Sequence, residues 1–265
     1  MVSAETLPGA TSSPEAAFKL NAIIMPAFRS RAYVIAERRV RVRLEEGFDT
    51  VLLMGEAGTG KTTLLSSLAA ELPWAHSVVH LQQPPFNPRE ALARWREIEA
   101  SAGESRRVIV LVDDCDLLPI ELQVVACEAR RSERGVRVQF VLAVKPSAYG
   151  RFSGVAAHLD EDMACCTLGR LEDDEIADFV DHRLTVAGAN QGHFTREALA
   201  HVALCAQGVP RLVTLLCAKA SFLAGMNNEL RVSAASVEEA AFVLRLGNIS
   251  VGRMSEDSAA ALSAA

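Results

Sequence analysis

Short apolar runs alternate with helical patterns through the first two thirds of the chain. The runs are rich in valine, leucine and isoleucine, and each is apolar almost throughout, without the polar alternation of a half-exposed strand. Strands of this kind, separated by helices, are typical of a parallel sheet covered on both faces. The pattern therefore predicts an α/β fold with a five-stranded parallel sheet. The predicted strands cover residues 50–54, 77–81, 108–112, 136–143 and 163–168.

Beyond Leu171 the pattern is that of helices alone. Residues 171–188 begin with acidic side chains and end at a glycine, which is typical of one helix, and residues 194–208 repeat this scheme. Residues 209–225 form a third pattern with a proline near the first turn. Ser236 begins an S-x-x-E sequence that predicts the start of a fourth helix. We therefore expect a small helical lid domain to follow the sheet domain.

These patterns divide the chain into four parts. Both ends are low-complexity sequences of small and polar residues, which predicts disorder. The expected parts are a disordered N-terminus at 1–17, a core domain at 18–170, a helical lid at 171–248 and a disordered tail at 249–265.

Composition excludes several classes of protein. Among 265 residues, 50% are hydrophobic and the mean hydropathy is +0.17, which excludes global disorder. The net charge of -6 disfavours a protein that coats nucleic acid or membrane nonspecifically. No run approaches the roughly 18 apolar residues of a membrane span, and the N-terminus lacks a secretory pattern. The 6 cysteines show no metal-ligand spacing and suggest a cytoplasmic protein with reduced thiols.

The most specific motif is GEAGTGKT at 55–62, which fits G-x-x-x-x-G-K-[ST]. It follows an apolar strand and opens a helix expected to start at Thr62, so backbone N–H groups and the helix N-terminus can bind phosphate. Lys61 places a positive charge on the terminal phosphates, and the Thr62 hydroxyl can bind Mg²⁺. The motif predicts an ATP–Mg²⁺ site. The predicted phosphate-binding residues are Gly55, Glu56, Ala57, Gly58, Thr59, Gly60, Lys61, Thr62 and Thr63.

Partner carboxylates follow the third predicted strand, in the sequence VIVLVDDCD. Asp113 and Asp114 come at the carboxyl end of this strand, where α/β sheets bind their ligands. Asp113 is predicted to hold Mg²⁺, and Asp114 to act as the general base that orients the attacking water. Asp116 is expected only to begin a loop or cap a helix.

The sequence resembles AAA+ ATPases of the general secretion pathway A type over residues 18–245. The most specific stretches are HRLTVAG at 182–188, F-x-x-x-A-L at 194–199 and GVPRLVTLLCAKASFLAG at 208–225. The resemblance implies an ATPase that forms a homo-oligomer or ring with ATP and acts on a protein client. It also implies that Arg211 is the sensor-2 arginine that reaches from the lid to the γ-phosphate, a role that suits a guanidinium.

Three positions depart from the family pattern. Asp114 stands where the family usually carries glutamate, and Lys145 replaces the polar sensor-1 residue. Glu161 falls near the expected arginine finger, with Arg151 and Arg170 as nearby substitutes. An arginine supplied by a neighbouring subunit can raise the rate by ~10³–10⁵. These departures predict slow hydrolysis.

A basic segment at 29–43 holds six arginines and one glutamate. Transposition-helper AAA+ ATPases (TniB-like) are similar in the core and bind DNA, so this segment and a second cluster could follow a phosphate backbone. Alternatively, neighbouring acids balance a solvated helix face, which the acidic pI of about 5.6 favours. A nucleotide-gated assembly factor with little hydrolysis stays open as a third class. The second cluster is Arg130, Arg131, Arg134 and Arg137, and the balancing acids are Glu37, Glu45 and Glu46.

Overall fold

The computed structural model contains two compact units, Arg29–Arg170 and a helical unit formed by Met1–Phe28 with Leu171–Ala265. Most of the two ends predicted to be disordered lies outside the described residues, as do Arg130, Arg131, Arg134 and Glu161. Within the described part, no helix combines the length and apolar character of a membrane span. The structure describes residues 17–18, 27–72, 77–82, 87, 90, 93, 97, 107–117, 137–159 and 162–246.

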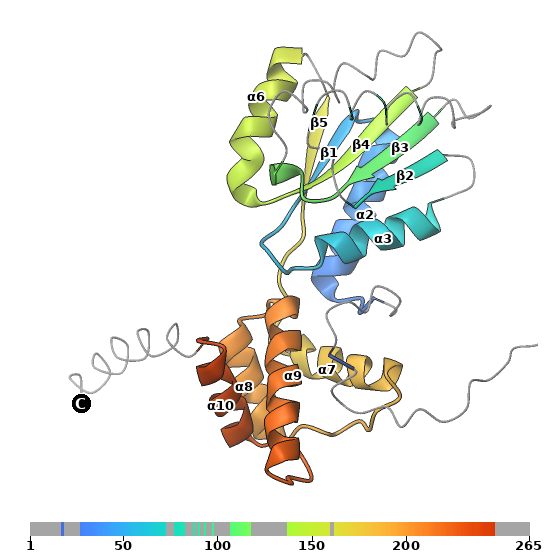
Figure 1. The fold of residues 1–265 in the computed structure, drawn as a ribbon. Coiled ribbons are helices and arrows are strands. Elements are labelled where there is room, and N and C mark those ends of the chain that lie inside the picture. Colours follow the sequence, from blue (N-terminus) through green and yellow to red (C-terminus); the bar gives the residue numbers. More distant parts are fainter. Residues whose placement is uncertain are drawn as a thin grey trace, which may run out of the picture. The chain divides into compact units, whose positions relative to one another are not determined.

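The first unit is built on a five-stranded parallel sheet with the order β2-β3-β4-β1-β5 (Figure 1). This confirms the fold class that the apolar runs predict. In the central register, Thr50 of β1 lies opposite Phe140 of β4 and Met163 of β5. The strands are β1 (Thr50–Met54), β2 (Ser77–Leu81), β3 (Arg107–Val112), β4 (Arg137–Val144) and β5 (Met163–Thr167).

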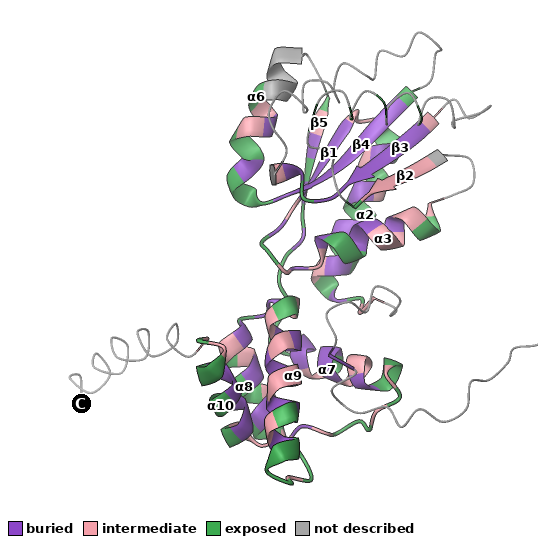
Figure 2. Cartoon of the chain, in the orientation of Figure 1, coloured by how far each residue is buried: buried purple, intermediate pink, exposed green. Residues whose placement is uncertain are grey.

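Both faces of this sheet are covered. Figure 2 shows that the central strands are buried, which explains why they are apolar on both faces. On one face, alternate residues of β1, β3 and β4 pack with Phe152 of α6 (Tyr149–Leu159). Helix α2 (Arg31–Glu46) contacts β1 and β5, and α3 (Lys61–Glu71) contacts β2 and β3. Short 3-10 turns, η1 (Cys115–Leu117) and η2 (Pro146–Ala148), follow β3 and β4.

The second unit is helical, as predicted, and its core is mostly aliphatic. Phe18, which the sequence places in the sheet domain, packs instead in this core together with Ala17. Its ring lies edge-on to Phe194, with 5.9 Å between the ring centroids. The two residues are too few to show a helical period, so their apolar character alone gave no sign of which unit buries them. The helices are α7 (Glu175–Val186), α8 (Arg196–Ala206), α9 (Pro210–Met226) and α10 (Ala234–Val243).

The last helix is capped differently from the S-x-x-E prediction. Ser233 is the N-cap of α10, and its Oγ accepts a hydrogen bond from the backbone N–H of Ser236 at 3.3 Å. Ser236 therefore lies inside the helix, and its hydroxyl donates to the Glu229 carboxylate at 2.8 Å. Two serines three residues apart compete for the cap, and the upstream one satisfies the free N–H groups of the first turn.

The chain passes between the units at two single peptide bonds. At the first, Phe28 packs on Phe179 of the helical unit, and Arg29 pairs with Glu37 of α2. At the second, Arg170 pairs with Glu56, and the next residue, Leu171, is buried in the helical core. Each link thus joins an arginine held in the sheet unit to an apolar residue held in the helical unit.

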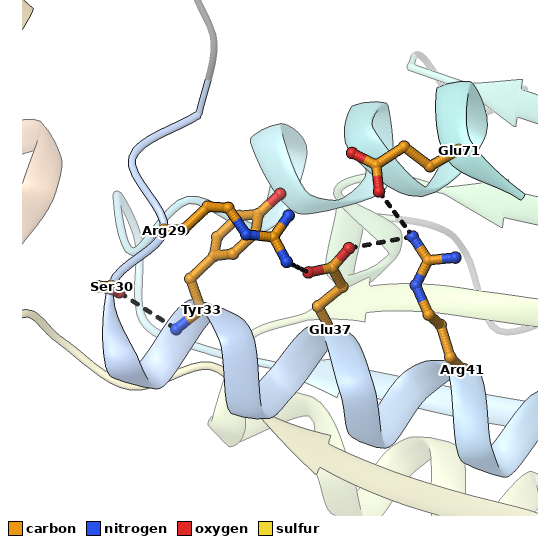
Figure 3. Close-up of polar contacts among 6 residues, drawn as sticks. All are labelled: Arg29, Ser30, Tyr33, Glu37, Arg41 and Glu71. Carbon is orange, nitrogen blue, oxygen red and sulfur yellow. Dashed lines mark hydrogen bonds and ion pairs between the residues drawn. The ribbon is translucent and has the colours of Figure 1, made fainter. Parts of the chain in front are cut away.

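Most of the basic segment at 29–43 lies in α2, and much of its charge is balanced within the unit. Glu37 is only 5% exposed and accepts from Arg29 at 2.6 Å and from Arg41 at 3.0 Å (Figure 3). Arg41 also bonds to Glu71 of α3 at 2.9 Å, so the network joins the two helices. Arg43 pairs with Glu46 one turn on. Three of the six arginines of the basic segment are thus paired with neighbouring acids.

The Glu37 network predicts that removing the carboxylate and removing its two arginine partners lower the free energy of unfolding by different amounts. Glu37→Ala removes the buried carboxylate and leaves two arginines that can return to water, so we expect a loss of about 1–2 kcal/mol in the free energy of unfolding. The double variant Arg29→Ala/Arg41→Ala leaves Glu37 buried without either guanidinium, and we expect a loss of about 3 kcal/mol. Urea denaturation measures both. Equal losses would mean that burial of the carboxylate does not dominate the network.

Candidate functional site

Three central strands bring the predicted site residues to one edge of the sheet. The phosphate loop follows β1, Asp113 and Asp114 follow β3, and Lys145 follows β4. Backbone hydrogen bonds fix these segments to their neighbours. The Gly55 N–H donates to the carbonyl of Val144 at 3.2 Å, and the Asp113 N–H donates to the carbonyl of Leu81 at 3.0 Å. Carboxyl ends of parallel strands are where α/β sheets bind ligands.

The loop conformation depends on its glycines, as Gly60 and Gly55 illustrate. Gly60 has φ 104° and serves as the N-cap of α3, a conformation that other residues rarely adopt. A Cβ on Gly55 would lie 2.7 Å from the Thr59 hydroxyl and 3.0 Å from the carbonyl of Leu168. The loop therefore folds closely on itself and on the segment after β5. Helix α3 begins at Lys61, one residue earlier than predicted.

The start of α3 is left open to an anion. Gly60 provides no side-chain cap, and the first turn carries no acidic residue. By contrast, Ser30 and Thr195 cap the N-termini of α2 and α8 with their hydroxyls. Free N–H groups and the positive end of the helix dipole are features that bind phosphate.

The Lys61 side chain stabilises the phosphate loop by hydrogen bonds to its backbone. Its ammonium group is buried and donates to the carbonyls of Gly55 at 2.7 Å and Glu56 at 3.0 Å. Burial lowers the pKa of Lys61, and the nearby carboxylates, Asp116 foremost, oppose this effect. The lysine is thus held beside the loop carbonyls, next to the open end of α3.

The predicted magnesium ligands are in direct contact. The Thr62 hydroxyl donates to Asp113 Oδ2 at 2.5 Å, across 51 residues of sequence. Asp113 is buried at the end of β3, and its other oxygen accepts the N–H of Asp114 at 3.0 Å. A hydroxyl and a carboxylate oxygen that converge in this way are hard donors of the kind Mg²⁺ prefers. The donor set therefore fits the ion.

Asp114 lies at the same edge in a left-handed backbone conformation, with φ 47°. Aspartate tolerates this region better than most residues. Partial burial raises the pKa of Asp114, and the neighbouring charges of Asp113 and Asp116 raise it further. A carboxylate with a raised pKa is a better proton acceptor once it is ionised.

The two candidate substitutes for an arginine finger are both engaged in their own unit. Arg170 bonds through Nε and Nη2 to the carboxylate of Glu56, inside the phosphate loop. Arg151 donates from Nη2 to the carbonyl of Asp116 at 2.8 Å. Each guanidinium is therefore already bonded within the sheet unit.

The structure also reveals a contact that sequence reasoning missed. Lys145, at the end of β4, pairs with Asp116 at 2.9 Å between Nζ and Oδ2. The sequence offered one signal: a lysine directly after a buried strand, beside a strand followed by three aspartates. Asp116 was expected only to begin a loop, and its partner could be found only from the strand order.

The remaining predicted residues are spread over both units. Ala57 and Thr63 are exposed on the loop and the first turn of α3. Arg211 is exposed at the start of α9, in the helical unit. The structure thus brings together the phosphate loop with Asp113, Asp114 and Lys145.

Comparisons with known sequences find an NTPase family model and a protein of the general secretion pathway. The model of the family described as Novel STAND NTPase 5 matches residues 26–149. General secretion pathway protein A of Aeromonas hydrophila is 26% identical over 225 residues, which cover 75% of this chain. The chain spans 41% of the length of that relative.

Solved structures show the same fold at low sequence identity. The ORC2 protein of Aeropyrum pernix, solved with ADPNP and ADP, has a TM-score of 0.59 at 17% identity, covering 84% of this chain and 70% of that one. Cdc6p of Pyrobaculum aerophilum has a TM-score of 0.63 at 14% identity, covering 86% and 70%. The chain therefore has the P-loop NTPase fold of the AAA+ type, and its resemblance to ATPases of the general secretion pathway A type is confirmed.

Proposed function

We propose that the chain binds ATP with Mg²⁺ at the phosphate loop and hydrolyses it slowly to ADP and phosphate. The observation that carries this proposal is the contact between the Thr62 hydroxyl and Asp113, beside an uncapped helix N-terminus and a buried lysine. Groups at one edge of the sheet can thus bind an anion, bind a hard cation and activate a water molecule.

Each group has a distinct task in this proposal. The loop N–H groups and Lys61 bind the phosphates, and Thr62 and Asp113 hold Mg²⁺. The bound ion neutralises charge that develops on the phosphate oxygens. Asp114 accepts a proton from the attacking water and orients its oxygen toward the terminal phosphate. Arg211 contributes from the lid as the sensor-2 residue that the family resemblance implies.

The test is ATP binding and turnover by the whole chain. Calorimetry with ATP and Mg²⁺ should show a single site, and a phosphate-release assay should show turnover below the ~1–100 per second usual for kinases. Size-exclusion chromatography with and without ATP reports whether the nucleotide drives assembly. Absence of nucleotide binding in a folded sample would overturn the proposal.

We further propose that hydrolysis is coupled to assembly of an oligomer or a protein partner, in a helper role for secretion or the cell envelope. The support is the similarity to general secretion pathway protein A over 75% of this chain. If both binding and ATP-dependent assembly are observed without turnover, the chain is better described as a nucleotide-gated assembly factor. The departures at Asp114 and Lys145 favour that outcome among the alternatives.

A DNA-binding transposition helper is the competing function, and α2 provides its test. Arg38 and Arg39 are exposed on α2, whereas Arg29, Arg41 and Arg43 pair with carboxylates. We therefore expect weak or no binding to duplex DNA at physiological salt, measured by fluorescence anisotropy. Tight binding that falls by about one log unit per log unit of salt for each phosphate contacted, and that Arg38→Ala/Arg39→Ala weakens, would favour the helper.

A further inference from the structure

We propose that Arg170 is a positioning residue for nucleotide binding, because it holds and neutralises Glu56, a carboxylate that the phosphate loop itself carries. This role rests on the proposed function, since it concerns how the loop binds its nucleotide. A loop that binds an anion through its N–H groups and Lys61 also carries a negative charge of its own, and the structure places a guanidinium on that charge.

Glu56 lies where the phosphate loop closes on itself. Its carbonyl accepts hydrogen bonds from the Lys61 ammonium group at 3.0 Å, from the Thr59 hydroxyl at 3.0 Å and from the Thr59 N–H at 3.4 Å. Glu56 is also the only acidic residue in the sequence GEAGTGKT at 55–62. The backbone of the one acidic residue of the loop is therefore in direct contact with the lysine that is expected to bind phosphate.

The negative charge of Glu56 would oppose the binding of phosphate if nothing neutralised it. A glutamate side chain extends only a few ångströms from its backbone, and salt screens exposed charges over about 8 Å at physiological ionic strength. The carboxylate therefore acts within range of the groups that bind the phosphates, and like charges repel. A carboxylate at this position needs a cationic partner if the loop is to bind a nucleotide tightly.

Arg170 provides this partner through two of its nitrogens. Nε donates to Glu56 Oε2 at 3.0 Å, and Nη2 donates to the same oxygen. A guanidinium remains charged throughout the physiological pH range, so it neutralises the carboxylate under all conditions in which the chain would bind ATP. The two side chains are 43% and 54% exposed, and exposed ion pairs contribute little to folding. We therefore expect the pair to affect nucleotide affinity rather than the fold.

The backbone before Arg170 is fixed against the phosphate loop. The Leu168 N–H donates to the carbonyl of Met54 at 2.7 Å, and the Leu168 carbonyl lies 3.0 Å from the position that a Cβ on Gly55 would take. Arg170 follows two residues later and is the last residue of the sheet unit. The neutralising charge therefore comes from the link to the helical unit and not from the loop, so nucleotide affinity should depend on a residue of that link.

Calorimetry with a non-hydrolysable ATP analogue and Mg²⁺ tests this role at low and at high salt. We expect Arg170→Met to weaken binding about 3- to 10-fold relative to the wild type at low salt, and less at high salt, where the carboxylate is screened. Arg170→Lys keeps the charge and should stay within about 2-fold of the wild type. Arg43→Met is the matched control, because it breaks a similarly exposed pair with Glu46 in the same unit, and it should leave the affinity unchanged.

A double-mutant cycle separates neutralisation of Glu56 from any other role of Arg170. In the Glu56→Gln background there is no charge to neutralise, so Arg170→Met should change the affinity by less than about 2-fold. A loss of the same size in both backgrounds, or a loss in Arg170→Met that high salt does not reduce, would overturn the inference. Failure of the wild type to bind the analogue would instead overturn the proposed function.

Discussion

Replacing Lys61 with alanine is expected to lower the affinity for ATP by at least about 10²-fold while leaving the fold intact. Hydrogen bonds to charged groups contribute roughly 1.5–3 kcal/mol each, and the ammonium group of Lys61 can make more than one to the phosphates. In the structure the same group donates hydrogen bonds to the carbonyls of Gly55 and Glu56. Losing the ammonium group therefore removes a contact to the phosphates and also the hydrogen bonds that hold the loop carbonyls in place.

Calorimetry of the purified variant measures this effect, with thermal unfolding to confirm the fold. Lys219→Ala is a matched control, because this lysine lies on α9 with its Nζ 5.0 Å from the centroid of the Phe222 ring. It should leave ATP affinity unchanged. A folded Lys61→Ala protein that binds ATP as tightly as the wild type would refute the phosphate-loop assignment.

The second large effect is expected at Asp114, where Asp114→Glu should raise turnover by up to about 10²-fold. A general base must lie within ~2.6–3.2 Å of its water. One methylene fewer withdraws the carboxylate by on the order of 1 Å, and a misplacement of that size can reduce the rate about 10²-fold. Steady-state phosphate release by oligomeric samples, with saturating ATP, measures the difference.

The backbone conformation at Asp114 is expected to make the Asp114→Glu variant less stable, although its turnover rises. With φ 47°, the position favours aspartate, and glutamate there is expected to lower the free energy of unfolding by about 1 kcal/mol. Asp114→Asn is the matched control, since it suits the same backbone and lacks a base, and it should abolish turnover. Wild-type turnover of ~1–100 per second would contradict the claim of impaired chemistry. If neither wild type nor Asp114→Glu hydrolyses ATP, the departure at the expected arginine-finger position limits the rate more than the length of the Asp114 side chain does.

Much of the sheet could be predicted from the sequence because its signals are local. Each buried strand is a continuous apolar run, so β1 and β2 begin and end where the pattern predicts. The phosphate loop was equally clear, because a single stretch of eight residues contains its glycines, lysine and threonine. The carboxylates after β3 followed from the rule that ligands bind at strand ends.

Features that depend on the choice between distant partners could not be predicted. The pairing of Lys145 with Asp116 requires the order of the strands, which the hydrophobic pattern does not give. Phe18 could pack against either unit, since an isolated aromatic residue shows no period. The arginines of α2 were ambiguous for the same reason, because Arg41 is balanced partly by Glu71, 30 residues away.

The helical unit is joined to the sheet unit at two separate points of the chain. Each is a single peptide bond, between Phe28 and Arg29 and between Arg170 and Leu171, with side chains anchored on both sides. Because the helical unit contains both an early and a late stretch of the chain, a single backbone cut at either link would leave the two units joined through the other.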